Sequence, residues 1–356
     1  MARRFAALAG LAALCLPAAR ARSVTISNVV PRRATDGAIL DAHDSKIFAL
    51  YDQYLWYAAS YGNCTEPAGD SGCATTKVGA CGFQTNHNVT LYTSPDLVTW
   101  TNAGVVFGAI GNLPPNSVLF APKTVFNPTT KRFVMYFNYI IGDFSKSFYG
   151  VATSATPTGP FELAVANVPL RYDDNGDENL LVDDDGTAYL IYTTLSHGHG
   201  MSVERLAPDY LSSLAASDPS QSSGIFGDGG VEAPALFKRA GVYYAVFGSC
   251  CCYCGSGSVV SVYTAASALG PYTKRGALAA PAGAGAVPPF GSQQTDIFEY
   301  TDSAGAAQFL YVGDHWQSAP DRLKSHDFTV WAPLSFTADG NVTTAGFQAS
   351  FTIDVA

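Results

Sequence analysis

Residues 229–247, with the sequence GGVEAPALFKRAGVYYAVF, hold the pattern that decides the fold. A single acidic residue, Glu232, stands at the start of an apolar strand, which leads through the turn KRAG into an aromatic strand. A carboxyl at the inner end of a strand loses hydration, and this loss raises its pKa toward that of a useful general acid. A solvated glutamate at a loop–strand junction is the commoner alternative, so the interpretation depends on what recurs elsewhere in the chain.

The same succession of elements occurs five times along the chain. In each copy a strand leads through a polar turn into a Tyr- or Phe-rich strand, and a more polar strand then ends at a turn with Pro or Gly. The copies centre on residues 51–57, 127–136, 183–192, 229–247 and 302–312. Short strands at regular intervals predict an all-β fold, and a repeat of roughly 55–75 residues predicts propeller blades. We therefore expect a single five-bladed β-propeller over residues 22–356, closed by a last strand at 346–355.

The composition narrows the class of protein and of partner. The chain has 356 residues, of which 14% are charged, and its net charge is −9. So few charges among so many apolar residues exclude a disordered chain. The negative net charge argues against a nucleic-acid partner.

The first 21 residues have the features of a secretory signal peptide. Arg3 and Arg4 form the basic start, residues 5–16 the apolar run, and residues 19–21 a small-x-small cleavage site. The apolar run is too short to span a bilayer. We expect a secreted protein that acts as a monomer without a membrane partner. N-glycosylation sequons, which suit a secreted surface, begin at Asn63, Asn88 and Asn341.

Export changes how the cysteines are interpreted. Seven of the eight cysteines remain after removal of a signal peptide, because only Cys15 lies within it. An oxidising compartment favours disulfides. We expect one disulfide within the group Cys64, Cys73 and Cys81, another that involves the cluster at 250–254, and at least one thiol without a partner in the chain. The cluster also fits half of a zinc site, but no second half exists at ligand spacing.

The first strand of each propeller blade lines the central channel, so residues at the starts of these strands should converge on one pocket. The polar residues at the five starts are Asp44, Lys123, Asp177, Glu232 and the pair Gln293 and Gln294. Glycosidic hydrolysis needs two carboxyls across a sugar ring, an acid for the leaving oxygen and a base for water. A third carboxylate nearby raises the pKa of the acid by like-charge repulsion.

At three of these strand starts the chain resembles glycoside hydrolase family 43, a family of inverting five-bladed β-propellers. The segments that carry the resemblance are 42–47 (AHDSKI), 177–186 (DENLLVDDDG) and 232–239 (EAPALFKR). The resemblance covers nearly the whole mature chain. It implies that Asp44 is the general base, that Asp177 tunes the pKa of the acid, and that Glu232 is the general acid.

Two segments, APK at 121–123 and GDHW at 313–316, are similar to members that act on galactose-containing chains. Some of those members lack the Asp of the first blade and use Gln, so Gln293 or Gln294 is an alternative base. His315 stands where an Arg is common, which leaves the preferred sugar open. The residues expected to bind the substrate are His43, Lys123, Gln293, His315 and, as a sugar-stacking ring, Trp316.

No cofactor is expected. The run DDDG at 183–186 invites a calcium site, but a hairpin turn close to type I′ explains it better, and a central calcium ion is an alternative that no motif indicates. We expect a hydrolase that releases arabinose, xylose or galactose residues from wall polysaccharides or oligosaccharides. The inverting mechanism predicts carboxyls of Asp44 and Glu232 roughly 6.5–9.5 Å apart. The alternative function is a carbohydrate-binding propeller that has kept the pocket and lost turnover.

Overall fold

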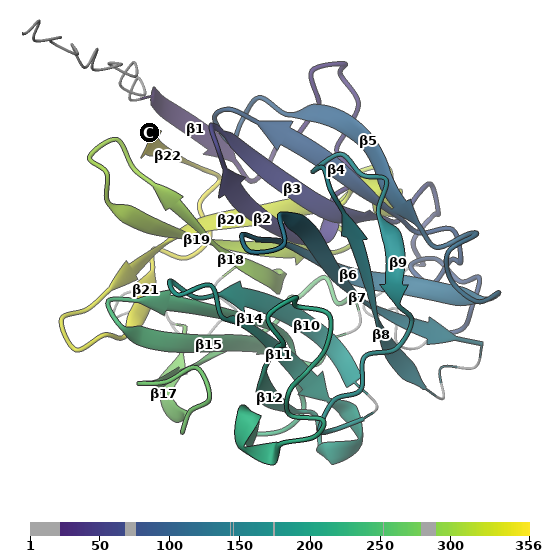
Figure 1. Ribbon diagram of the computed structural model, residues 1–356. Coiled ribbons are helices and arrows are strands. Elements are labelled where there is room, and N and C mark those ends of the chain that lie inside the picture. Colours follow the sequence, from purple (N-terminus) through teal and green to yellow (C-terminus); the bar gives the residue numbers. More distant parts are fainter. Residues whose placement is uncertain are drawn as a thin grey trace, which may run out of the picture.

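The computed structural model describes residues 22–67, 76–142, 144, 146–173, 175–251, 253–278 and 290–356. Within these ranges the chain forms five antiparallel sheets of four strands that stand in a ring around a central axis (Figure 1). This arrangement is a five-bladed β-propeller, which confirms the predicted fold. None of the helices in these ranges has the length and apolar character that crossing a membrane requires.

Each blade uses four strands that follow one another in sequence, the first innermost. The first blade comprises β2 (His43–Leu50), β3 (Gln53–Ser60), β4 (Asn88–Ser94) and β5 (Thr101–Gly108). The second comprises β6 (Ser117–Asn127), β7 (Arg132–Ile141), β8 (Ser147–Ser154) and β9 (Glu162–Val165). The third comprises β10 (Asn175–Val182), β11 (Ala188–Thr194), β12 (Gly200–Arg205) and β13 (Ser222–Phe226). The fourth comprises β14 (Val231–Arg239), β15 (Val242–Ser249), β16 (Val260–Ala265) and β17 (Thr273–Ala277). The fifth comprises β18 (Gln293–Thr301), β19 (Ala307–His315), β20 (Phe328–Phe336) and β21 (Val342–Thr344).

The second strand of each blade explains the recurring aromatic runs. β3, β7, β11, β15 and β19 are buried along most of their length, as in β11 with the sequence AYLIYTT. Neighbouring blades cover both faces of each sheet, so these strands carry apolar residues on both faces. Among the fourth strands, β17 is mostly exposed, whereas β21 is mostly buried. Single turns of 3₁₀ helix occur at Leu195–His197, Pro219–Gln221 and Lys324–His326.

The expected last strand does close the ring, but through a partner that the sequence analysis did not identify. β22 (Ser350–Val355) pairs antiparallel with β1 (Arg22–Ser27) in a separate two-stranded sheet. Ile26 and Ile353 of this sheet share one core with Trp56 of the first blade and Trp331 of the fifth. Asn28 adds two hydrogen bonds to the backbone of Trp331, at 2.8 and 2.9 Å. The paired termini therefore join the first and last blades.

The DDDG run forms the predicted hairpin between β10 and β11, although the turn type differs. Only Gly186 in the run has a positive φ, at 81°, whereas a type I′ turn needs positive φ at both central residues. The backbone N–H groups of Asp183 and Gly186 donate to Thr187 O and Asp183 O, which makes a wider loop. The Asp183 carboxylate accepts a hydrogen bond from Lys238 Nζ at 2.6 Å, so it ties the third blade to the fourth.

Both expected disulfide groups are confirmed. Cys64 pairs with Cys81 in the insertion between β3 and β4, and Cys251 pairs with Cys254 in the loop that follows β15. Cys250 has a free, exposed thiol. Two further cysteines, Cys73 and Cys252, lie outside the described residues.

Candidate active site

The inner strand of every blade is bulged at the same level, and the predicted site residues lie at these bulges. The register shifts fall between His43 and Lys46, Phe120 and Lys123, Asn175 and Glu178, Glu232 and Ala235, and Gln294 and Asp296. Three of the bulges contain a residue other than Gly with positive φ: Asp44 at 49°, Ala121 at 46° and Ala233 at 54°. Such conformations are uncommon and cluster at functional sites, and a bulge re-aims the side chains around it.

The bulges surround a cavity with an empty volume of about 230 Å³ at one mouth of the central channel. Its lining includes five of the polar residues predicted at strand starts: Asp44, Lys123, Asp177, Gln293 and Gln294. Glu232 joins them by accepting a hydrogen bond from the Gln293 side chain. The structure therefore brings the residues of all five strand starts together.

Glu232 is held by two donors at the start of β14. Its Oε1 accepts hydrogen bonds from the Cys251 backbone N–H at 2.7 Å and from Gln293 Nε2 at 2.8 Å. Burial, helped by the charge of Asp177, raises the pKa of Glu232 to about 8, although the donors favour the ionised form. Glu232 therefore keeps its proton at neutral pH, as a general acid requires.

Asp44 faces the same cavity from β2. Its Oδ2 accepts a hydrogen bond from the Tyr61 hydroxyl, and its backbone N–H donates to Asp314 Oδ2 at 2.8 Å. Burial raises the pKa of Asp44 to about 7, with further contributions from the charges of Asp314 and Asp177. Asp44 and Glu232 therefore both have raised pKa values, and the charge of Asp177 contributes to each.

Asp177 links the two other carboxyls electrostatically. Its Oδ2 accepts a hydrogen bond at 3.1 Å from the backbone N–H of Ala233, which is next to Glu232 in the chain. Burial raises the pKa of Asp177, and the opposing charge of Lys123 lowers it. The charge of Asp177 in turn raises the pKa of both Glu232 and Asp44.

Lys123 lies beneath the cavity with 2% of its surface exposed. Its ammonium donates to the backbone carbonyls of Asp44 at 2.9 Å, Ser45 at 2.7 Å and Thr295 at 2.9 Å. An ammonium has three N–H donors, so all of them are used and none is free for a sugar hydroxyl. Lys123 therefore joins the first blade to the fifth and acts on the carboxyls through its charge.

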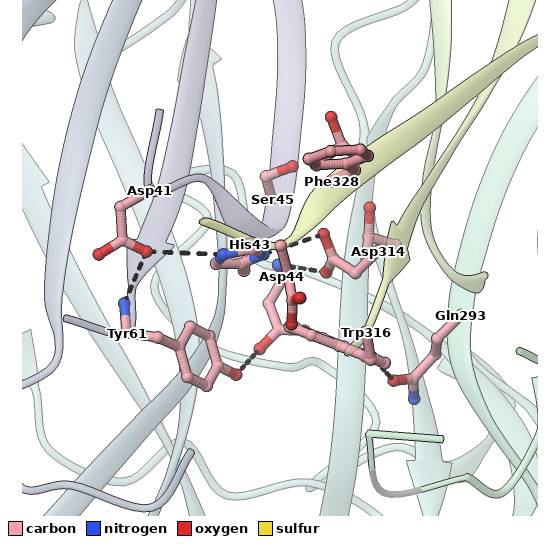
Figure 2. A network of polar contacts seen from close by, with 12 residues as sticks. Asp41, His43, Asp44, Ser45, Tyr61, Gln293, Asp314, Trp316 and Phe328 are labelled. Atoms are coloured by element: carbon pink, nitrogen blue, oxygen red, sulfur yellow. Dashed lines mark hydrogen bonds and ion pairs between the residues drawn. The ribbon is translucent and has the colours of Figure 1, made fainter. Parts of the chain in front are cut away.

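The His43 ring lies between the carboxylates of Asp41 and Asp314 (Figure 2). Its Nε2 lies 3.6 Å from Asp41 Oδ1 and its Nδ1 lies 3.5 Å from Asp314 Oδ1, and the ring is fully buried. Burial lowers the pKa of His43, but hydrogen bonding and charge from Asp314, with the charge of Asp41, together raise it above its usual value. In this structure His43 contacts carboxylates, and its ring is not open to a ligand.

Trp316 is buried as well, with 1% of its surface exposed. Its ring packs 5.1 Å from the His43 ring and 3.7 Å from the Lys324 ammonium. The indole Nε1 donates to Gln293 Oε1 at 2.7 Å (Figure 2). The Gln293 amide donates in turn to Glu232. Trp316 and Gln293 thus form a chain of hydrogen bonds that ends on the acid candidate.

Gln294 and His315 lie farther from the reacting groups. Gln294 is fully buried, and its Nε2 donates to the carbonyls of Ala233 at 3.0 Å and Val246 at 2.9 Å, which ties β18 to the fourth blade. His315 is partly buried, and burial lowers its pKa against the charge of Asp327. Its Nδ1 has no hydrogen-bond partner among the described residues.

Four residues that the sequence analysis did not single out complete the site: Asp41, Tyr61, Glu178 and Asp314. Glu178 is 1% exposed, and neither of its carboxyl oxygens accepts a hydrogen bond from a described residue. Burial raises the pKa of Glu178 well above its usual value.

The sequence held a signal for three of these four residues. Asp41 and Glu178 are direct neighbours of quoted motif residues, and Asp314 lies inside GDHW. Nothing local marks Tyr61, which lies in a loop and reaches Asp44 only through the fold.

Comparison with curated proteins finds a fungal relative that matches part of the chain. The β-D-galactofuranosidase xynD of Aspergillus niger is 28% identical over 197 residues, which are 51% of this chain and 54% of the relative. The chain therefore spans about half the length of the curated relative that it matches.

Solved structures are similar over a larger part of the chain. A GH43 β-1,3-galactosidase, solved with galactodeoxynojirimycin, superposes with a TM-score of 0.72 and 22% identity, covering 90% of this chain and 98% of its own. An exo-β-1,3-galactanase from Clostridium thermocellum superposes with a TM-score of 0.74 and 24% identity, covering 93% of this chain and 67% of its own. An exo-β-1,3-galactanase from Phanerochaete chrysosporium, solved with galactose, gives 0.71 and 22%, with 93% and 69% covered. At this identity the three likenesses establish the fold.

A family model assigns the chain more directly. The model described as glycosyl hydrolases family 43 matches residues 41–341, a range that includes all five blade starts with Asp44, Asp177 and Glu232. This match confirms the resemblance found at the strand starts. The chain belongs to glycosyl hydrolases family 43.

Proposed function

We propose that this chain is an exported glycoside hydrolase that cleaves β-linked galactose residues from polysaccharides or oligosaccharides with inversion at the anomeric carbon. Family membership supports hydrolysis of a glycosidic bond. The names of the similar proteins support galactose, because they are a β-D-galactofuranosidase, a β-1,3-galactosidase and exo-β-1,3-galactanases. Two disulfides support an oxidising compartment.

The observation that carries the proposal is the meeting of two buried carboxyls at the bulged strand starts: Asp44 lines the cavity, and Glu232 accepts a hydrogen bond from Gln293, which also lines it. Burial raises the pKa of both carboxyls toward neutral pH, and a pair of carboxyls of this kind can divide into base and acid. The hydrogen bonds assign the roles, with Glu232 held by Gln293 and the Cys251 N–H and Asp44 by the Tyr61 hydroxyl. Glu232 donates its proton to the glycosidic oxygen as the bond to the anomeric carbon breaks. Asp44 takes a proton from a water molecule, whose oxygen attacks the opposite face of the sugar. Asp177 keeps Glu232 protonated through its charge.

Asp44 is the better candidate for the base than either glutamine. The amide oxygen of a glutamine is a far weaker base than a carboxylate. Gln294 holds the carbonyls of Ala233 and Val246, and Gln293 bridges Trp316 and Glu232. The Asp44 carboxylate has one described donor, the Tyr61 hydroxyl, on Oδ2. Its other oxygen is therefore the acceptor best placed to take a proton from water.

Hydrolysis of 4-nitrophenyl glycosides tests the sugar preference. We expect release of nitrophenol from the β-galactopyranoside or β-galactofuranoside, with the α-L-arabinofuranoside and β-xyloside cleaved more slowly. Preferential cleavage of the pentosides would contradict the galactose assignment. Binding of galactan without any turnover would support a carbohydrate-binding propeller instead.

The stereochemistry has its own measurement. Proton NMR of the first product should show the α-anomer released from a β-linked substrate, because water attacks the face opposite the leaving group. A β-anomer as the first product means retention, which would require a nucleophile in place of the water-activating base.

A further inference from the structure

We propose that the loop closed by the Cys251–Cys254 disulfide positions both reacting carboxyls, and that Tyr253 within it is a positioning residue for Asp44. The inference rests on the proposed function, because it concerns how the same two carboxyls are held. Neither Tyr253 nor the disulfide contacts the sugar in this scheme. They act through the groups that they place.

On the acid side the contact is a backbone hydrogen bond. The N–H of Cys251 donates to Glu232 Oε1 at 2.7 Å. The disulfide fixes the direction of this N–H, because it closes a ring in which the Cys254 N–H also donates back to Cys251 O at 3.2 Å. The donor on Glu232 is thus part of a covalently closed turn.

On the base side the contact passes through two tyrosines. The Tyr253 hydroxyl lies 3.2 Å from the Tyr61 hydroxyl, and Tyr61 donates its own proton to Asp44 Oδ2. The Tyr253 hydroxyl also lies 2.9 Å from Gly82 O, so its one proton is shared between two acceptors. Donation to Tyr61 makes that hydroxyl a stronger donor to Asp44, because hydrogen bonds in series polarise one another.

Tyr253 is held in place by packing against Trp316 and Lys324. The Tyr253 ring packs 4.9 Å from Trp316 and lies 4.2 Å from the Lys324 ammonium, which also forms ion pairs with Glu66 and Asp327. These partners belong to the insertion after β3 and to the segment between β19 and β20. The loop therefore packs against segments of the first and fifth blades.

Gly82 allows the backbone of the first insertion to contact the Tyr253 ring. A Cβ at this position would lie 2.8 Å from Cε2 of Tyr253, closer than real Cβ atoms approach, and its φ is +85°. Only glycine lets the backbone next to Cys81 come so close to the tyrosine. The Cys64–Cys81 disulfide thus supports the first insertion where it meets the second disulfide loop.

Loss of the contacts to Glu232 and Asp44 should change the pH dependence of kcat/KM in a characteristic way. Both donors favour the ionised form of the carboxyl that they touch, so losing them raises the pKa of that carboxyl. The base must be ionised, and its pKa sets the acid limb of the kcat/KM profile; the acid must be protonated, and its pKa sets the alkaline limb. Release of the loop therefore moves both limbs to higher pH, whereas a general loss of folded enzyme lowers the profile without moving it.

Tyr253→Phe isolates the base side. The variant keeps the ring against Trp316 and Lys324 and removes only the hydroxyl. We expect kcat to fall a few-fold with KM nearly unchanged and the acid limb to move to higher pH, while the alkaline limb stays. A loss of activity with an unmoved acid limb would overturn the role of Tyr253 and leave it a packing residue.

The double variant Cys251→Ser/Cys254→Ser isolates the disulfide, with Cys64→Ser/Cys81→Ser as the matched control. We expect kcat/KM to fall about 10- to 100-fold in the first variant, the cost of a small misplacement of a reacting group, with the alkaline limb raised. The control should lower the melting temperature without moving the alkaline limb. An unmoved alkaline limb in the first variant, with folding verified by circular dichroism, would overturn the inference.

Failure of the proposed function gives a different result. If the wild-type protein hydrolyses no glycoside, ¹³C NMR titration of the Asp44 and Glu232 carboxyls still measures their pKa values in each variant. Higher values in the loop variants than in wild type support the inference without any turnover, and equal values refute it. If the Ser variants do not fold, Tyr253→Phe, which keeps the disulfide, decides by the same titration.

Discussion

The two ends of the central channel differ in both volume and chemistry. At the end with the bulged strand starts, the cavity measures about 230 Å³ and is lined by carboxyls and amides. At the opposite end, the same strands line a much larger cavity of about 1120 Å³. Its lining is mostly apolar and includes Phe48, Leu50, Phe126, Leu181 and Leu236. The larger of these two cavities is therefore not the one where the polar residues of the strand starts meet.

A polar partition separates the two ends. Lys46 Nζ donates to Asn179 Oδ1 at 3.0 Å and to Asp296 Oδ1 at 3.2 Å, across three blades. On one side of it the bulges direct polar residues inward, and on the other the strands run in regular register and present mostly apolar side chains. Perturbed pKa values mark a candidate active site more directly than volume does.

The largest expected effect follows from Glu232→Gln, which removes the proton donor. On oligosaccharides, whose leaving group needs protonation, kcat/KM should fall toward the upper end of about 10²–10⁴-fold. On 4-nitrophenyl glycosides the loss should be much smaller, because nitrophenolate leaves without a proton. Glu299→Gln is the matched control, since Glu299 lines the large cavity at the other end of the channel. It should leave both rates within twofold of wild type, and an equal loss on both substrates of Glu232→Gln would place the acid elsewhere.

Asp44→Asn comes next and removes activation of the water. Steady-state kinetics should show kcat/KM lower by about 10²–10³-fold on good and poor leaving groups alike, because water attack does not depend on the leaving group. Activity near wild type would mean that Asp44 is not the base. Gln293 would then be the first alternative to test.

Asp177→Asn tests whether the charge of Asp177 raises the pKa values of Asp44 and Glu232. The wild-type kcat/KM profile should be a narrow bell between the pKa values of about 7 for Asp44 and about 8 for Glu232. Removal of the negative charge of Asp177 lowers both values, so both limbs should move to lower pH. We expect a several-fold loss at pH 8, where Glu232 is then more fully ionised. A profile that keeps its position would show that Asp177 acts by some means other than its charge.

The smallest effect on activity is expected at the apolar end of the channel. Leu181→Ala removes part of the lining of the large cavity, and its side chain is partly buried. The free energy of unfolding should fall by about 2 kcal/mol, the lower end for a Leu→Ala change in a core, while kcat/KM stays within twofold. Urea unfolding and steady-state kinetics measure the two quantities. Lost turnover at unchanged stability would give the apolar cavity a part in the reaction.

The positions of the carboxyls followed from the sequence because the pattern that reveals a blade is local. A polar turn followed by an aromatic strand, as at 238–247, identifies a hairpin within a few residues, and the inner strand then lies just before the turn. Counting back from five such turns leads to Asp44, Asp177 and Glu232 without any knowledge of contacts. The cysteine groups were equally local, since each of the two disulfides among the described residues joins cysteines of one loop.

What the side chains do at the site depended on the closed ring. Lys123 finds its acceptor on Thr295, 172 positions away, and Tyr253 meets Tyr61 across 192 positions. The bulges turn these groups inward, and neighbouring blades bury Trp316 and His43, which the sequence analysis expected at a sugar. Local patterns specify which strands form, because hairpins are short-range. Which polar atoms meet is decided through space, by the closure of five blades around one axis.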